Sequence, residues 1–285
     1  MGQGHVESPS YPIEIPFQGS RDNKPYIWEV HNSGATRTGF LGIPECRELV
    51  ENIVPGLYLK TYPYRDQAMA SARVTMTLSH PRSILMLARY EDEYVGYGVF
   101  PRLVIRGDSV VYSSRAFTAA HEGQGLGTNA LDQVIKIHND ELRRLHQKPL
   151  AYGALYTGSP VSLASIVRSE NTDNVRPLFR REGLKGGGRY VMLSGPQRVV
   201  KEIHSLFLPN TTSLNNLTGV CRGELRDIGP NQSYIPGRSV LADQIYGEMI
   251  STYPDGLDMN IPQGDVVIVV YDIKAGDPVV SRVAA

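Results

Sequence analysis

Apolar runs separated by short charged turns occupy the middle of the chain. Residues 84–90, 94–105 and 110–118 are rich in branched and aromatic side chains, and Glu91-Asp92-Glu93 and Arg106-Gly107-Asp108 separate them. Such runs bounded by polar turns are typical of β-strands. Short connections such as these join antiparallel neighbours, so the pattern predicts an antiparallel meander over residues 84–118.

The periodicity changes at Gly123. Beyond Gly127 the residues that share one helical face recur every three or four positions, at Leu131, Val134, Ile135, His138, Leu142 and Leu145. This spacing predicts an amphipathic helix that ends near residue 145. Arg143 and Arg144 fall in its last turn, where cations favour the helix dipole.

Weaker patterns complete the outline. Helices are predicted at 44–52, 64–78, 174–182 and 196–206, strands at 151–156, 190–193 and 265–271, and an apolar stretch of open type at 161–167. Residues 1 to about 40 show no sustained periodicity and are interpreted as an extended arm that depends on the rest of the protein for order. The predicted division is 1–50 (arm and first helix), 51–195 (core) and 196–285 (C-terminal extension).

The composition excludes several classes of protein. A chain of 285 residues that is 41% apolar can form a sizeable core, which excludes a disordered protein. Lys and Arg number 29, as do Asp and Glu, so no basic excess points to nucleic acid. Cys46 and Cys221 lack the spacing of a metal or disulfide motif. Without an apolar span or an N-terminal apolar signal, we expect a cytoplasmic protein with no membrane partner and no metal.

Three glycines lie between the strand at 110–118 and the amphipathic helix. Gly123, Gly125 and Gly127 let backbone N–H groups approach an anion, and the helix N-terminus adds unpaired donors. The expected ligand is a phosphate or pyrophosphate, and the alternative is a plain tight turn. A Walker loop would need a Lys after the last glycine, and a dinucleotide fingerprint would need the third glycine one residue later.

Residues 117–128 resemble the coenzyme-A-binding motif of the GNAT superfamily of acyl-CoA N-acyltransferases, which reads Arg/Gln-x-x-Gly-x-Gly/Ala after the family's fourth strand. Gly125-Leu126-Gly127 matches the paired small residues, and Gly123-Gln124 matches the preceding Gly-x. Phe117 stands where the family has a Val whose backbone pairs with the pantetheine arm. Glu122 departs from the pattern, because it occupies the Arg/Gln position.

A second segment, residues 174–184, resembles the family's final motif, which lies on a helix. Leu178, Gly183 and Leu184 fit it, while Phe179 replaces the Tyr that commonly protonates the departing thiolate. Asn171 and Asn174 bracket the place of the motif's Asn. Five basic residues between Arg176 and Arg189 are either a clamp for the coenzyme A phosphates or a solvated helix face.

The resemblance covers about residues 55–195. It implies a mixed α/β (α+β) fold with a mostly antiparallel central sheet flanked by helices. It also implies an N-acetyltransferase that moves an acetyl group from acetyl-CoA, without a metal, to an amine on a small molecule or protein by direct attack in a ternary complex. The implied cofactor-binding residues are Phe117, Thr118, Ala119, Glu122, Gly123, Gln124, Gly125, Leu126, Gly127, Thr128, Asn171 and Asn174.

The general base is the least defined part of this interpretation. Neither face of the strand at 110–118 carries a carboxylate, so we expect a water chain held by Tyr112 and Ser113, with Glu91, Glu93 and His121 as alternatives. Two other functions stay open at this point: a non-catalytic acyl-CoA sensor or scaffold, and a phosphate-binding module unrelated to coenzyme A. A homodimer is also left open.

Overall fold

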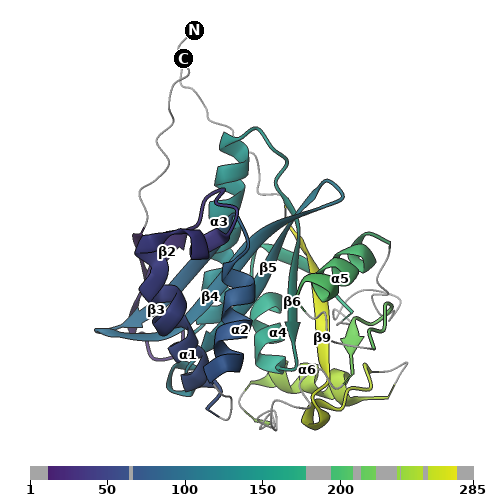
Figure 1. Ribbon diagram of the computed structural model, residues 1–285. Coiled ribbons are helices and arrows are strands. Elements are labelled where there is room, and N and C mark those ends of the chain that lie inside the picture. Colours follow the sequence, from purple (N-terminus) through teal and green to yellow (C-terminus); the bar gives the residue numbers. More distant parts are fainter. Residues whose placement is uncertain are drawn as a thin grey trace, which may run out of the picture.

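The computed structural model describes residues 12–63, 67–177, 194–207, 213–222, 236–237, 239–252 and 256–274. Within these residues the centre is a nine-stranded sheet of order β1-β2-β3-β4-β5-β6-β9-β7, with β8 beside β9 (Figure 1). All neighbours pair antiparallel except β5 and β6. The predicted mixed fold with a mostly antiparallel sheet is confirmed. The strands are β1 (Ile13–Gln18), β2 (Pro25–Asn32), β3 (Ser83–Tyr90), β4 (Glu93–Ile105), β5 (Asp108–Phe117), β6 (Leu150–Thr157), β7 (Thr172–Arg176), β8 (Val220–Cys221) and β9 (Val266–Ile273).

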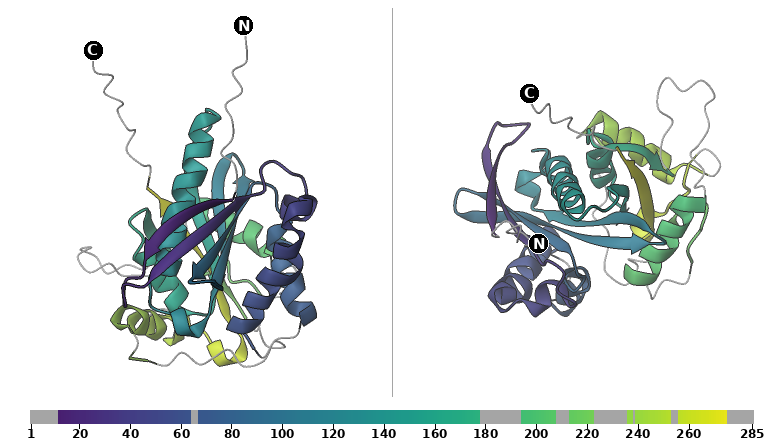
Figure 2. Two further views of the ribbon diagram at one scale, coloured as in Figure 1. Left: turned by 90° about the vertical axis from the view of Figure 1, so that its left-hand side faces the viewer. Right: turned by 90° about the horizontal axis from the view of Figure 1, so that it is seen from above.

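Helices cover both faces of this sheet. The described α-helices are α1 (Val54–Thr61), α2 (Gln67–Leu78), α3 (Leu126–Arg144), α4 (Pro160–Val167), α5 (Ser194–Phe207) and α6 (Val240–Ile250). On β5, Val111 packs in the core with α3, α4 and α6, whereas Val110 and Ala116 pack with α5 and with α1 and α2 respectively. Successive side chains of a strand point to opposite faces, so α3, α4 and α6 share one face, the α3 face, and α1, α2 and α5 share the other, the α2 face. Figure 2 shows α1 and α2 on the opposite side of the sheet from α3.

Within the segment predicted as an extended arm, residues 13–32 form a β-hairpin of the main sheet, which corrects the prediction for these residues. Tyr26, Trp28 and Val30 of β2 are buried on the α3 face, and the intervening residues are half-buried. β2 pairs with β3 along seven residues, so the hairpin extends the sheet by two strands. The helix predicted at 44–52 consists of a short 3-10 turn (Pro44–Cys46) and a π turn (Leu49–Ile53) that leads into α1.

The C-terminal region also contributes to the central sheet. β9, a fully apolar run apart from Asp272, lies between β6 and β7 and is buried on both faces. The expected boundaries at residues 50 and 195 therefore cut through one sheet, because β1, β2 and β9 come from outside the predicted core. The sequence predicts a strand at 265–271, but its residue pattern does not indicate which strands it pairs with.

Residues 172–176 form a strand where a helix was predicted to begin at Asn174, and this too is a correction. Arg176 binds Asp272 of β9 with both guanidinium nitrogens (2.6 and 2.7 Å), and the Asn174 amide donates to the same carboxylate (2.7 Å). The apolar stretch at 161–167, whose type the sequence left open, is helix α4. Residues 178–193, with the rest of the predicted helix and the strand at 190–193, lie outside the described residues.

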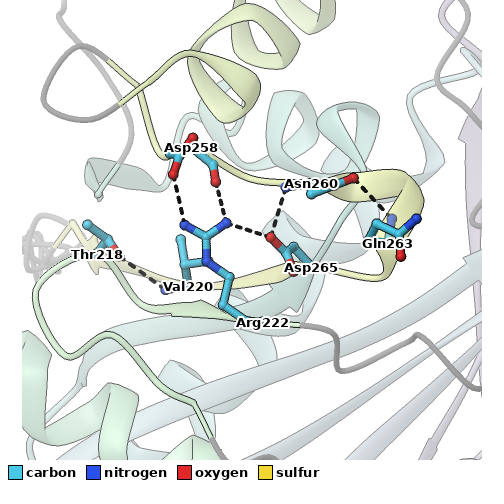
Figure 3. A network of polar contacts seen from close by, with 7 residues as sticks. All are labelled: Thr218, Val220, Arg222, Asp258, Asn260, Gln263 and Asp265. Atoms are coloured by element: carbon cyan, nitrogen blue, oxygen red, sulfur yellow. Dashed lines mark hydrogen bonds and ion pairs between the residues drawn. The ribbon is translucent and has the colours of Figure 1, made fainter.

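Arg222 ties the end of β8 to the turn that precedes β9. Its guanidinium binds the carboxylates of Asp265 (2.7 Å) and Asp258 (3.3 Å) and the carbonyl of Asp258 (Figure 3). Asp265 also accepts from the Asn260 N–H (2.8 Å). This network fixes the entry to β9, and through β9 the position of β6 beside the candidate site.

Candidate functional site

β5 and β6 are paired over the first part of β5 and are no longer paired beyond Ser113 and Leu155. Their parallel pairing runs from Ser109 opposite Leu150 to Ser113 opposite Leu155 and stops there, although β5 continues to Phe117 and β6 to Thr157. Beyond the last pair each strand stays bonded to its other neighbour, β4 or β9. The facing edges of residues 114–117 and 156–157 therefore present backbone groups without each other as partners, and an extended ligand with amide groups can supply them.

The glycine loop follows directly from this separated end of β5. Gly123 and Gly125 adopt φ values of +81° and +77°, in the left-handed region that favours glycine. Gly125 is the N-cap of α3, and no side chain of the described residues caps this helix. The N–H groups of the first turn have no partner within the helix, so they and the positive end of the dipole are available to an anion.

A buried guanidinium lies beneath the same turn. Arg115 of β5, on the α3 face, donates from Nη1 to the carbonyl of Gly127, and its Nη2 is buried without a hydrogen-bond partner among the described residues. Burial lowers the pKa of this guanidinium from its ordinary value. Because an Arg remains charged across the physiological range, Arg115 supplies a fixed positive charge below the loop. Spacing alone gave no reason to single it out.

Position 127 is also closely packed. A Cβ there would lie 3.3 Å from Nη1 of Arg115 and 3.3 Å from Cβ of Ser165 on α4. Thr128 donates its hydroxyl to the Ser165 carbonyl (3.0 Å). Helix α4 therefore lies beside the N-terminus of α3. The sequence instead predicts that a helix at 174–182 contributes to this site.

Some of the other predicted loop residues are exposed at the loop, and others make contacts that stabilise its conformation. Ala119 is exposed, Glu122 precedes the glycines, and Leu126 is the first residue of α3 and is buried. Phe117 lies edge-on to Trp28 at 6.2 Å between ring centres. Thr118 donates both its N–H and its hydroxyl to the Val95 carbonyl (3.0 and 3.1 Å). The Gln124 side chain is buried and bonded to Asp22. A loop lies between β5 and α3, as the sequence predicts, and the Thr118 and Gln124 side chains bond within the fold; a cofactor-binding role of these residues stays a prediction.

Asn171 and Asn174 are not brought to the glycines. The Asn171 amide donates to Asp132 of α3 (2.8 Å), which also accepts from Ser169 (2.5 Å), and Asn174 lies on β7 beside Asp272. Both amides bond to carboxylates within the fold. Their role in binding a cofactor stays a prediction that these contacts do not support.

Tyr112 and Ser113 stand at the last paired positions of β5 and point to opposite faces. The Tyr112 ring is buried on the α2 face, stacked on Phe207 of α5 at 4.1 Å and parallel to Tyr156 of β6 at 6.4 Å. Ser113 is fully buried on the α3 face, and its Oγ has no hydrogen-bond partner among the described residues. Ser113 thus has an available hydroxyl next to the separation, whereas Tyr112 is enclosed by rings.

Two groups near the separation escaped the sequence analysis. Arg73 of α2 lies over the ring of Tyr156, 5.4 Å from its centre, and donates to its hydroxyl. Tyr271 of β9 lies across Gly153 of β6, where a Cβ would be 2.1 Å from the ring, and its buried hydroxyl has no hydrogen-bond partner within the described part of the chain. Burial raises the pKa of Tyr271 well above its ordinary value.

Among the described residues no group of three or more His, Cys, Asp or Glu is arranged to hold a metal ion, and Cys46 and Cys221 are buried and unbridged. None of the described helices combines the length and the apolar character needed to cross a membrane.

Comparison with known proteins gives similarity of fold to GNAT acetyltransferases over about half of the chain. The GNAT domain of S. lividans PAT is 12% identical with a TM-score of 0.37, over 62% of this chain and 96% of that one. An acetyl transferase from Salmonella typhimurium that modifies the N-terminal serine of ribosomal protein L7/L12 is 12% identical with a TM-score of 0.35, over 54% and 86%. The microcin C7 self immunity acetyltransferase MccE, solved with acetyl-CoA and AMP, is 13% identical with a TM-score of 0.32, over 57% and 87%.

No family model and no curated protein matches the sequence. The identities and TM-scores of the solved structures are too low to carry any argument about the chemistry of this chain.

Proposed function

We propose that the protein binds acetyl-CoA and transfers the acetyl group to an amine. The observation that carries the proposal is the conjunction of two features at one end of β5: the strand separates from β6, and it then enters a left-handed glycine loop with an uncapped helix N-terminus. The separated strand edges suit the amide-bearing pantetheine arm, and the loop suits the pyrophosphate.

The residues present fit coenzyme A at the loop. Backbone N–H groups from Gly123 to Thr128 would hold the pyrophosphate, and the Nη2 of Arg115, which has no hydrogen-bond partner among the described residues, supplies a buried positive charge beneath them. Phe117 and Ala119 would border the pantetheine arm where β5 leaves the sheet. When bound, acetyl-CoA supplies the activated acyl group.

Transfer requires a group that takes a proton from the attacking amine, because an ammonium ion is not a nucleophile. We propose that a water held by Ser113 serves, since this hydroxyl is buried at the separation without a partner among the described residues. Tyr112 remains in the proposal as the neighbouring residue. Its ring stack supports a role in shaping the α2 face rather than in holding water. Loss of Ser113 is expected to lower kcat by about 10²-fold, the lower end of the range for a positioned acid or base.

A non-catalytic acyl-CoA sensor is the second candidate. It is favoured by the enclosure of Tyr112 and by the absence of a carboxylate on either face of β5 between Val110 and Phe117. Under this function the protein would bind acetyl-CoA and release it unchanged.

The experiment that separates the two uses acetyl-CoA labelled in the acetyl group. The protein is incubated with it and a panel of amines that includes peptides with free N-termini, lysine peptides, polyamines and amino sugars, and products are detected by mass spectrometry. Label in an amine supports transfer. Binding of acetyl-CoA with no labelled product across the panel and in a metabolite extract supports the sensor. Absence of binding would reject both.

A further inference from the structure

The turn of the β1–β2 hairpin, Gly19–Lys24, is seated directly against the glycine loop. The Ser20 N–H donates to the Gln124 carbonyl (2.9 Å), and the Ser20 hydroxyl donates to the Gly123 carbonyl (3.3 Å). The Gln124 side chain donates to the Asp22 carboxylate (2.7 Å) and accepts from the Asp22 N–H (3.3 Å). These hydrogen bonds join two segments that lie about a hundred residues apart in the sequence.

These contacts leave the donors of the loop available. Each of them uses a carbonyl oxygen or a side chain of the loop, and none uses a backbone N–H of residues 123–128. The seating is also tight, because a Cβ on Gly19 would lie 2.6 Å from Oε1 of Gln124 and 2.9 Å from the Tyr26 ring. The turn therefore packs against the loop, with Oγ of Ser20 3.0 Å from the place of a Cβ on Gly125, and among the described residues it takes none of the loop N–H groups as a hydrogen-bond donor.

Two cations of this turn lie at the loop. The Arg21 side chain passes 3.8 Å from the place of a Cβ on Gly123, and it is 72% exposed, with a 3.7 Å ion pair to Asp22. Lys24 lies over the Tyr90 ring, 5.2 Å from its centre. Burial and, after it, the positive charge of Lys24 lower the pKa of His121. Asp22 is itself bonded to Gln124, so its carboxylate is engaged on the side of the loop.

Cations near the loop would favour the binding of a phosphate there, because a carboxylate lies close to the same place. Glu122 places a carboxylate next to the glycines, and like charges disfavour a phosphate there. The Arg115 guanidinium offsets this negative charge. Its Nη1 is bonded to the first turn of α3, and its buried Nη2 has no hydrogen-bond partner in the described part of the chain. From the hairpin side, Arg21 approaches Gly123, and Lys24 acts on His121, which lies two residues before Gly123.

We infer that the hairpin turn is the second wall of the coenzyme A phosphate site, with Arg21 and Lys24 binding the phosphate groups of the ADP portion. The inference rests on the proposed function. It assigns a binding role to a segment in which the sequence showed no chemistry, and it explains why the turn is bonded to the loop rather than left in solvent.

The test is calorimetric titration of the full chain with coenzyme A, dephospho-coenzyme A and pantetheine. The variant is Arg21→Gln/Lys24→Gln. The matched control is Arg47→Gln/Lys60→Gln, which also removes one Arg charge and one Lys charge. Arg47 has the same kind of environment as Arg21, being 75% exposed with a 3.9 Å ion pair to Glu51, and both control residues belong to the segment that packs on the α2 face.

We expect the hairpin variant to bind coenzyme A about three- to tenfold more weakly per charge removed, the range between an exposed ion pair and a charge-assisted hydrogen bond. Pantetheine, which lacks phosphates, should bind wild type and variant alike, and added salt should weaken wild type more than the variant. A loss seen with coenzyme A but not with dephospho-coenzyme A places the cations on the 3′-phosphate, and an equal loss with both places them on the pyrophosphate.

The inference is overturned if wild type binds coenzyme A and the hairpin variant binds it equally well, or if the variant and the control lose affinity to the same extent. Either result would leave the proposed function standing. Failure of wild type to bind coenzyme A would instead reject the proposed function, so the two failures are distinguishable.

Discussion

Two arginines of the sheet, Arg115 of β5 and Arg102 of β4, lie near opposite ends of α3. Each has buried guanidinium nitrogens that lack hydrogen-bond partners among the described residues, and burial lowers the pKa of both guanidinium groups. Arg102 lies near Glu141 (3.6 Å) in the second half of the helix, whereas Arg115 is bonded to its first turn. Of the two, Arg115 is the one placed to act on an anion at the loop.

We therefore predict that Arg115→Met lowers the affinity for coenzyme A by about tenfold, as expected for the loss of a charge-assisted contact. Its melting temperature should change little, because an apolar side chain of similar length removes a buried, incompletely paired charge. Arg102→Met is the control and should leave affinity unchanged. Equal affinity of Arg115→Met and wild type, by calorimetry on folded protein, would remove Arg115 from the site.

His138 makes the stability of the fold depend on pH. It is fully buried on α3 near the Phe100 carbonyl (3.1 Å), with Glu141 and Arg102 beside it, and burial is the largest cause that lowers its pKa. The unfolded chain therefore binds a proton that the folded chain resists. Stability contributed by the neutral imidazole is present above the ordinary pKa of about 6.5 and is lost as pH falls below it.

Urea unfolding at pH 7.5 and pH 5.5 checks this prediction. One such proton can contribute at most about 1.4 kcal/mol per pH unit to the free energy of unfolding. His138→Asn should reduce the drop between the two pH values, whereas His146→Asn, at an exposed position after α3, should retain the wild-type drop. An identical pH dependence in both variants would contradict the assignment.

At the scale of elements, sequence pattern predicted best where neighbours along the chain are also neighbours in the sheet. The strands β3, β4 and β5 and the helix α3 lie within a few residues of their predicted bounds, because short turns and a 3.6-residue period are local signals. The loop that they frame was predicted for the same reason. The hairpin β1–β2 was missed, although Tyr26, Trp28 and Val30 alternate with less apolar residues as a half-buried strand should.

Contact between distant segments is what sequence pattern could not predict. Arg115 meets the loop only because β5 and α3 fold together, and the seating of the hairpin turn on Gln124 joins segments that no local period relates. The error at Asn174 is of another kind. A helix was expected to begin there, but the carboxylate of Asp272 on β9 engages Asn174 and Arg176 in a strand.

The contact between β6 and β9 permits a direct test of this element packing. Gly153 faces the Tyr271 ring so closely that Gly153→Ala must displace the ring, and overpacking of this kind costs about 1 to 3 kcal/mol in the free energy of unfolding. Gly56→Ala in α1 has no atom of the described residues within 4 Å of the new Cβ and should instead stabilise by up to about 1 kcal/mol. Equal midpoints of denaturant unfolding for the two variants would show that the β6–β9 packing is wrong.

At the scale of the whole molecule, one sheet integrates the three segments that the sequence suggested. A fragment of residues 51–195 would lack β1, β2, β8 and β9, so β3 and β6 would each lose one of their two neighbours and β7 would lose its only one. We predict that this fragment shows no cooperative thermal transition by circular dichroism, whereas the full chain does. A cooperative transition in the fragment would restore the predicted boundaries.

Binding of coenzyme A at the glycine loop is the central claim, and one calorimetric comparison tests it most directly. Gly125 (φ +77°) and Gly107 (φ +92°) are both left-handed glycines, but Gly107 lies in the β4–β5 turn with no atom of the described residues near its Cβ position. A valine at either position carries the same kind of backbone strain. Wild type and Gly107→Val should bind coenzyme A alike. Folded Gly125→Val should bind it at least about tenfold more weakly, because a Cβ there would lie 3.0 Å from Oγ of Ser20 and 3.7 Å from the Phe17 ring, so the valine must displace the loop that presents the N–H groups. Absence of binding by wild type, or equal affinity in all three proteins, would contradict the claim.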